Sequence, residues 1–473
     1  MTHAADPMAA IRYDEASSMP APEFAPVGSG GAGLRAPATV LAQSRDELFG
    51  LPPAKPAPDR PAAKPEPDRG FRLSGFYGLQ PAYTYAKPTH WSRAVNRFQL
   101  EATGSLGNQV KWKLGGRADI DPVYYGSDFY LDRVKHDQRT DFFWRENYID
   151  FGVGDWAFRV GAQQIVWGEV VGLFFADVVS ARDQREFVLP SFDIIRIPQG
   201  AVRAEYFKGD SHLELVWIPV PAFDNIGKPG SDFYPVPLPS PTPEAAANQF
   251  LDPNRPARTL RNANYGLRAN TLIEGWDLAA FYYRSYSAQP TFYRLPTAAG
   301  QPLLFEPRYD RIWQAGGTLS KDFRTFVLKA EAIYTGPRNY ASNDPTAPQG
   351  VLERRALDWI VGIDVPFQND VRLNVQGFQR LYFGGSDDQI ALDAGRFGAS
   401  VLISGKIAKL EPQILYIQTF GGGGGLIRPR VDWRLTPNTR LGFGVDIFTG
   451  PIDGLFGRYD NRDRIYSELR HDF

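Results

Sequence analysis

The stretch QVKWKLGGRADI, residues 109–120, decides the fold class of this chain. Apolar and charged side chains alternate along it, so Trp112 and Leu114 would share one face of a strand and Lys111 and Lys113 the other. A half-exposed sheet of a soluble protein has the same pattern, so alternation alone leaves that class open. The split recurs in VRLNVQGFQRLYF (371–383) and IRPRVDWRL (427–435).

Composition narrows the class. Hydrophobic residues make up 43% of the 473 residues and the mean hydropathy is −0.33, with no stretch approaching the roughly 18 to 20 apolar residues of a membrane-spanning helix. The absence of cysteine excludes disulfide scaffolds, thiolate metal sites and cysteine nucleophiles. The 52 basic and 53 acidic residues give no basic field, so we expect no nucleic-acid partner.

The rhythm of the connections separates a barrel from a soluble sheet. We predict about 18 strands, sixteen being the alternative count, whose links alternate between tight and long. The tight links are LGNQ (106–109), GVGD (152–155), KGDS (208–211), EG (274–275), KDFR (321–324), QND (368–370), GKIAK (405–409) and TPNT (436–439). The main long links span about 124–140, 171–200, 222–262, 289–307, 336–354, 384–394 and 450–459. Short turns at one end and long loops at the other are typical of an outer-membrane barrel, with the turns and both termini in the periplasm.

The chain divides into two regions. Residues 1–70 are rich in Ala, Pro and Gly and predict a disordered periplasmic extension, whereas 71–473 predict the all-β, transmembrane antiparallel barrel. Within the extension, 39–51 has helix-like spacing and is a candidate docking segment for a periplasmic partner, plain disorder being the alternative. No secretory signal is visible at Met1, so export is inferred from the barrel pattern.

The last strand ends in RIYSELRHDF, which places Phe473 on the apolar face. A terminal Phe after an alternating strand resembles the signal by which barrel-assembly machinery recognises outer-membrane proteins. We therefore expect that machinery and outer-membrane lipid as partners.

Two segments carry a family likeness: FFWRENYIDF (142–151) and FRVGAQQIVWGEVVGLFFADVVSARDQREF (158–187). They resemble a proteobacterial outer-membrane porin-like family of unknown function, related to alginate-export channels. Ala162 stands where that family often has Arg, and Ser180-Ala181 replaces an Asn-Pro step. The resemblance implies an 18-stranded pore for export or uptake. The matching residues are Trp167, Gly168, Glu169, Asp177, Arg182, Asp183, Arg185, Glu186 and Phe187.

The long link near 172–199 is the candidate constriction loop, because charges of both signs among phenylalanines suit a loop folded into the lumen. The alternative is an extracellular loop held by its own salt bridges. Its candidate residues are Glu169, Asp177, Arg182, Asp183, Arg185, Glu186, Asp193 and Arg196. A second loop, 233–250, is rich in Pro and predicts a lid, a surface recognition segment or, more simply, a solvated spacer.

The charged strand faces predict a polar lumen, which needs only to stay wet. An excess of Arg in the strands near 426 and 460 motivates the hypothesis of a mild preference for anions or acidic saccharides. The predicted lumen-lining residues are Lys111, Lys113, Arg117, Glu146, Asp150, Arg159, Gln163, Arg268, Arg372, Arg380, Arg428, Arg430, Arg434, Arg464 and Arg470.

These patterns predict a passive channel for a small or extended polar solute, with no enzymatic activity, cofactor or metal. The five histidines, His3, His90, His136, His212 and His471, lie beside no nucleophile motif in the sequence. A closed structural or adhesion barrel is the first alternative, and an outer-membrane hydrolase built on carboxylates is the second.

Overall fold

The computed structural model describes residues 71–107, 109–170, 176–236, 243–298, 300–342, 344–368, 370–385, 390 and 397–473. The predicted extension 1–70, with its candidate docking segment 39–51, lies outside these residues. Alternating side chains from Phe71 onward form one antiparallel sheet, in which each strand pairs with its neighbours along the chain.

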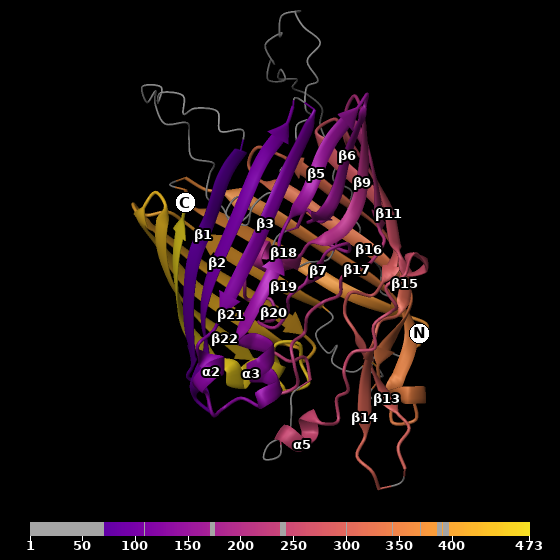
Figure 1. Cartoon of the computed structure of the whole chain (residues 1–473), viewed down its shortest axis with the longest axis vertical. Coiled ribbons are helices and arrows are strands. Elements are labelled where there is room, and N and C mark those ends of the chain that lie inside the picture. The colour runs from indigo at the N-terminus through magenta and orange to yellow at the C-terminus, as the bar shows by residue number, and fades with distance from the viewer. Residues whose placement is uncertain are drawn as a thin grey trace, which may run out of the picture. The chain divides into compact units, whose positions relative to one another are not determined.

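The sheet closes on itself as a barrel because the first strand pairs with the last, from Phe76 with Asp472 to Thr84 with Arg464 (Figure 1). Of its nineteen strands, β4 and β5 both pair with β3 and occupy one position, so the predicted barrel of 18 strands is confirmed. The strands are β1 (Phe71–Thr84), β2 (His90–Leu106), β3 (Val110–Ile120), β4 (Thr140–Trp144), β5 (Asn147–Val153), β6 (Trp156–Gln163), β9 (Gln199–Lys208), β10 (Ser211–Ile218), β11 (Asn264–Ile273), β12 (Trp276–Tyr286), β15 (Arg311–Asp322), β16 (Val327–Ala341), β17 (Val351–Pro366), β18 (Arg372–Phe383), β19 (Phe397–Ser404), β20 (Leu410–Phe420), β21 (Gly424–Thr436), β22 (Thr439–Thr449) and β23 (Arg464–Asp472).

The short turns fall where the sequence predicts them. Four non-glycine residues there have positive φ, a conformation that tight hairpins require and that costs little only for Gly, Asn or Asp: Glu274 at 50°, Arg324 at 67°, Asp370 at 58° and Ala408 at 55°. The strand expected near 356 begins earlier, at Val351, because the β16–β17 hairpin continues past a register shift between Thr335 and Arg338.

The two faces of the wall have opposite character. On β3, Leu114 is 56% exposed and points outward, whereas Arg117 is 1% exposed and points inward. On β22, Phe443 is 54% exposed and its near neighbour Asp446 is fully buried. Exposed apolar and buried charged residues on alternate positions are the reverse of a soluble protein's surface and suit lipid outside and a polar interior.

The long connections gather at the other end of the barrel, at the bottom of Figure 1, with their small elements. These are α2 (Val123–Gly126), α3 (Asp132–Gln138), α5 (Pro243–Ala247), β13 (Thr291–Leu295), β14 (Leu304–Arg308) and the 3-10 turns η1 (Leu260–Asn262), η2 (Pro348–Gly350) and η4 (Gly457–Arg462). Within the described residues, no helix has the length and apolar character of a membrane span.

The loop 233–250 differs from the solvated spacer that its prolines predict. Its first residues are buried: Phe233 contacts the rings of Phe448 and Tyr459, and Tyr234 contacts those of Phe250 and Phe292. Aromatic contacts of this kind stabilise a buried position for Phe233 and Tyr234. Residues 237–242 lie outside the described part.

Candidate functional site

The connection between β6 and β9 contacts opposite walls of the barrel from inside. We name residues 164–198 the luminal segment; its residues 171–175 are not described, and its elements are β7 (Ala181–Arg182), α4 (Phe192–Ile195) and β8 (Arg196–Ile197). It contacts inward side chains of β2, β3, β10, β11, β16 and β23. In the closed sheet β3 and β16 are separated by eight steps (β3, β5, β6, β9, β10, β11, β12, β15, β16), which is nearly half of the circuit.

On one wall, a carboxylate holds the first part of the segment. Glu331 on β16, 3% exposed, accepts hydrogen bonds from the backbone N–H groups of Val170 (2.7 Å) and Ala176 (2.9 Å) and from that of Glu169. The Glu169 side chain in turn pairs with Arg268 on β11 at 3.2 Å. Three backbone N–H groups share this one buried carboxyl, so Glu331 holds the turn against β16.

On the opposite wall, two arginines hold the end of α4. Arg117 on β3 donates to the carbonyl oxygen of Ile194 (3.1 Å), and Arg145 donates to that of Arg196 (2.9 Å) and to that of Asp193. The last carbonyls of a helix lack partners within the helix, and cations satisfy them. Arg145 lies between β4 and β5, where the strand is interrupted and both Arg145 and Glu146 face inward to pair with luminal groups.

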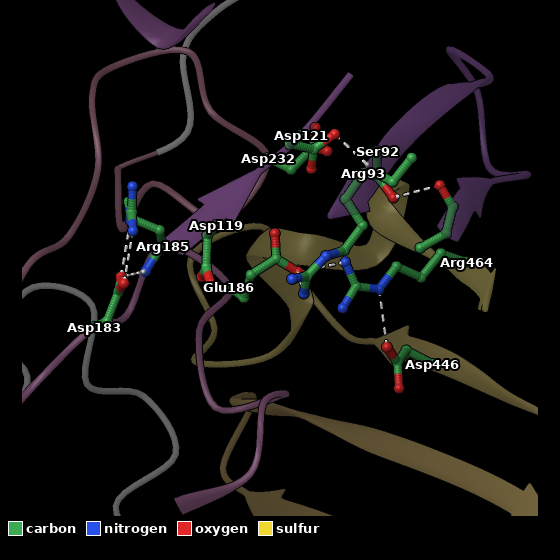
Figure 2. Close-up of polar contacts among 12 residues, drawn as sticks. Ser92, Arg93, Asp119, Asp121, Asp183, Arg185, Glu186, Asp232, Asp446 and Arg464 are labelled. Atoms are coloured by element: carbon green, nitrogen blue, oxygen red, sulfur yellow. Dashed lines mark hydrogen bonds and ion pairs between the residues drawn. The ribbon is translucent and has the colours of Figure 1, made fainter. Parts of the chain in front are cut away.

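A third contact is made by Glu186 in the middle of the segment. Its Oε2 pairs with Arg93 of β2 (3.0 Å) and with Arg464 of β23 (2.6 Å), and Arg464 also binds Asp446 of β22 (2.9 Å). Figure 2 shows the Glu186 carboxylate beside the guanidinium groups of Arg93 and Arg464. We name these residues, with Arg428, which binds Asp446 at 2.7 Å, the Glu186 cluster.

An apolar contact fixes the segment to the wall formed by β9, β10, β12 and β16. We name it the Trp167 cluster. Trp167 is 1% exposed, its ring centroid lies 5.3 Å from that of Phe281, and its indole N–H donates to Glu214 at 3.2 Å. Gly266 makes room for it, since a Cβ there would lie 2.7 Å from the indole. The cluster contains Ile165, Trp167, Ala176 and Val179 of the segment and Ala201, Val216, Ile218, Phe281, Tyr283 and Ile333 of the wall.

Beside the Glu186 cluster, between the segment and the wall, lies a cavity of about 190 Å³. Its charged lining is Arg93, Arg97, Lys406, Arg428, Arg430, Arg440, Arg464 and Arg470, against Asp193, Glu411, Asp432, Asp446 and Glu468. Eight of the lining side chains are cationic and five are anionic. Acids just outside the lining pair with four of the arginines: Glu186 with Arg93 and Arg464, Asp119 with Arg97, and Asp472 with Arg470. Of the lining residues, Arg428, Arg430, Arg464 and Arg470 are among those predicted to face the lumen.

The structure shows why an excess of Arg in two strands overstates the positive charge. Asp446, on the intervening strand β22, binds both Arg428 and Arg464. Glu468, on β23 itself, binds Arg430 at 2.8 Å. Missed inward residues are Arg93, Arg97, Arg145, Glu214, Glu331 and Asp446. The sequence pattern could have identified them, since each except Arg145 lies at an inward position of a strand with alternating apolar and polar residues.

The remaining predicted lumen-lining residues lie on the inward strand face, mostly in ion pairs. Lys113 pairs with Glu101 and Glu146, and Gln163 is buried and donates to the Ala201 carbonyl. Lys111 and Arg372 lie near the short-turn end of the barrel. Lys111 is the second residue of β3, and Arg372 is the first residue of β18. The other pairs are Asp150–Arg159 at 2.6 Å, Arg268–Glu169 at 3.2 Å, Arg380–Asp358 at 2.6 Å, Arg434–Glu411 at 2.5 Å and Arg470–Asp472 at 2.9 Å.

The predicted constriction residues are also linked within the segment. Arg196 pairs with Asp177 at 2.8 Å, and Arg185 pairs with Asp183 at 2.7 Å and with Asp141 of β4. The loop therefore combines its own salt bridges with contacts to the wall, features that the sequence analysis treated as alternatives.

Arg182 connects the segment to the loop after β10, because its backbone N–H donates to Asp224 at 2.8 Å. Burial raises the pKa of Asp224 to about 6, although nearby Arg182 opposes the shift. Burial likewise raises the pKa of Asp121, in the loop after β3, to about 6. Both loop carboxyls thus take up protons in mildly acidic solution.

A family model described as "Protein of unknown function (DUF1302)" matches residues 92–356, which is more than half of the chain and includes the whole luminal segment. This chain belongs to the DUF1302 family. Its assignment agrees with the predicted porin-like family of unknown function; a relation to alginate-export channels stays a prediction. The comparison with curated proteins finds no match.

Solved structures with a similar arrangement include several outer-membrane proteins. OmpF of Salmonella typhi in complex with daunomycin has a TM-score of 0.42 at 10% identity, over 85% of this chain and 97% of that one. OmpT of Vibrio cholerae with a deleted loop has a TM-score of 0.40 at 9% identity, over 85% and 99%. A mutant porin of Rh. blastica has a TM-score of 0.37 at 12% identity, over 85% and 100%. These values are too low to support a functional argument.

Proposed function

We propose that this DUF1302 protein is a bacterial outer-membrane channel through which a polar solute diffuses past the luminal segment. The observation that carries the proposal is that the exposed outer face of the wall is apolar and its buried inner face is charged. Leu114 and Phe443 are exposed outside, and Arg117 and Asp446 are buried inside. Such a wall is stable where lipid contacts the outer face, and its charged interior favours water.

The cavity beside the Glu186 cluster supports a finer proposal, a mild preference for anionic solutes, including acidic saccharides. Its lining has more cationic than anionic side chains, and low-dielectric walls strengthen the resulting field. The guanidinium groups would replace part of the hydration of a carboxylate or sulfate as it passes the constriction.

Planar-bilayer recording tests both levels of the proposal. We expect stepwise currents and, in a salt gradient, a reversal potential of the sign produced by anions. Arg430→Gln should move that potential toward cation selectivity, because Arg430 lines the cavity, whereas Arg261→Gln, at an exposed position in η1, should leave it unchanged. Cation selectivity of the wild type would contradict the finer proposal alone.

One observation favours a closed scaffold barrel instead. An apolar cluster occupies part of the interior, where Leu189 of the segment and Phe233 pack on inward Ile360, Ile417 and Phe448. Under this alternative a folded, reconstituted protein passes no current at any voltage. Liposome swelling with neutral sugars of graded size provides an independent check, because a channel admits the smaller sugars and a scaffold admits none.

The proposed location gives two partners. Outer-membrane lipid would contact the exposed apolar belt, and barrel-assembly machinery would bind the terminal strand. Phe473 is 48% exposed, stacks near Phe98 with ring centroids 5.9 Å apart, and exchanges backbone hydrogen bonds with Gly75. Deleting Phe473 should lower the yield of barrel assembled in the outer membrane while purified protein still refolds in detergent.

A further inference from the structure

Three potential metal ligands converge on the inner wall away from the cavity. Glu205 of β9 and His212 and Glu214 of β10 each offer one ligand atom, and these atoms all lie within 4.8 Å of one another. Two carboxylates and one imidazole from adjacent strands form a donor set that suits divalent transition metals better than Mg²⁺ or Ca²⁺, which prefer oxygen ligands alone.

The imidazole has the orientation that a metal ligand needs. Its Nδ1 lies 2.7 Å from the side-chain oxygen of Asn270, an atom that only accepts, so Nδ1 carries the hydrogen. In the neutral ring Nε2 then has the free lone pair. It lies 3.1 Å from Oε1 of Glu205 yet makes no hydrogen bond of good geometry, and it is buried.

Both carboxylates are oriented by partners outside the cluster. Oε2 of Glu205 pairs with Arg203 at 2.5 Å, and Oε1 of Glu214 accepts from the indole N–H of Trp167 at 3.2 Å. Metal-binding side chains are usually held in this manner, with the ligand's second polar atom engaged by an outer group. Phe207 stacks on the His212 ring with centroids 4.6 Å apart and further restricts it.

We propose that Glu205, His212 and Glu214 bind one divalent transition-metal ion, with Zn²⁺ the best fit. Zn²⁺ accepts nitrogen and oxygen ligands without a strong geometric preference, and three protein ligands leave a coordination position for water or a solute group from the lumen. Glu214 also accepts the indole N–H of Trp167, which belongs to the luminal segment. An ion bound to Glu214 would therefore connect the metal site to the position of the segment. The competing arrangement is a protonated His212 paired with Glu205, with no metal.

The test uses the full chain, refolded in detergent, purified without a polyhistidine tag and dialysed against a chelator. Isothermal titration with Zn²⁺ should show a binding site that His212→Ala and Glu214→Gln abolish, and Zn²⁺ should raise the unfolding temperature of the wild type only. Asn270→Ala should weaken binding by about 10- to 100-fold, the usual effect of removing an outer-sphere partner. The matched controls His136→Ala, in exposed α3, and Glu353→Gln, at an exposed position, should bind as the wild type does.

Cobalt provides a spectroscopic readout of the ligands. Co²⁺ added to the wild type should produce visible absorption bands that His212→Ala lacks, whereas Mg²⁺ should neither bind nor displace Zn²⁺. Each variant is first checked for the faster gel migration of an unboiled barrel, so that a loss of folding is not mistaken for a loss of the site. Absence of Zn²⁺ binding to the folded wild type, or equal binding by His212→Ala, would overturn the proposal in favour of the ion pair.

Discussion

Two of the contacts between the luminal segment and the wall are of opposite kind. In the Trp167 cluster, apolar side chains exclude water between segment and wall, and the Trp167 indole is among the largest fully buried side chains of the described residues. In the Glu186 cluster, contact is made by ion pairs, and a cavity with charged lining lies beside it. The comparison indicates that packing fixes the segment on the first side, while the second side, which is polar and hollow, is where a solute would pass.

Removing the indole should have the greatest effect. Trp167→Ala should cost about 3 to 5 kcal/mol of local stability, the usual loss for a buried Trp, and should loosen the packing of the segment on that wall. We expect a higher and noisier single-channel conductance. Trp144→Ala is the matched control, because Trp144 is 72% exposed on the outer face.

Gly266→Ala tests the same cluster with Trp167 itself left unsubstituted. The added Cβ would lie 2.7 Å from both the Trp167 ring and the Tyr283 ring of the same cluster, so at least one of the two rings must shift. Conductance equal to that of the wild type in both variants would show that the cluster does not determine the position of the segment.

The ion-pair side should respond differently. Glu186→Gln removes the charge that Arg93 and Arg464 share, and we expect a loss of about 2 kcal/mol, typical of a hydrogen bond to a charged group. The reversal potential should move toward the value expected for anion selectivity, because a negative charge beside the cavity is lost. Glu353→Gln serves as control, and a shift toward cations would be evidence against a solute path along this side.

Protonation of the loop carboxyls should have a smaller effect. The folded-state pKa of Asp224, about 6, exceeds the ordinary value of 3.8, so the folded protein binds this proton more tightly than the unfolded chain. Stability is therefore gained below that pKa and lost as pH rises through about 6, by about 1 kcal/mol between pH 5 and pH 7. Urea unfolding at the two pH values measures it, and Asp224→Asn should reduce the difference; a difference unchanged in that variant would assign it elsewhere.

The sequence predicts the barrel well because the deciding signals are local. Alternation within single strands and turn residues such as Gly209 and Gly275 specify strands and hairpins without information from distant residues. The count of 18 and the alternation of short and long links follow from these signals. Boundaries at the long-loop end, such as the start of β17, were less accurate because the hairpin there extends past a register shift.

The candidate site could be predicted only in part, because its contacts join residues far apart in the chain. The constriction loop was located from its mixture of charges and aromatic residues, but Glu331 lies 161 positions from Val170, and nothing local marks it as their partner. The inward Arg145 depends on the interruption between β4 and β5, which breaks the alternation that the prediction relied on. His212 appeared isolated at a turn, since its neighbours Glu205 and Asn270 come from adjacent strands.

Cysteine accessibility in reconstituted vesicles tests directly whether the barrel has lipid outside and water inside. The chain contains no cysteine, so single substitutions report without background. A membrane-impermeant thiol reagent should modify Arg430→Cys, at the luminal cavity, and should spare Phe443→Cys and Leu114→Cys, which a lipid-soluble reagent should reach. Rapid modification of the two outward positions by the impermeant reagent, with Arg430→Cys protected, would contradict the assignment of the two faces and the channel built on it.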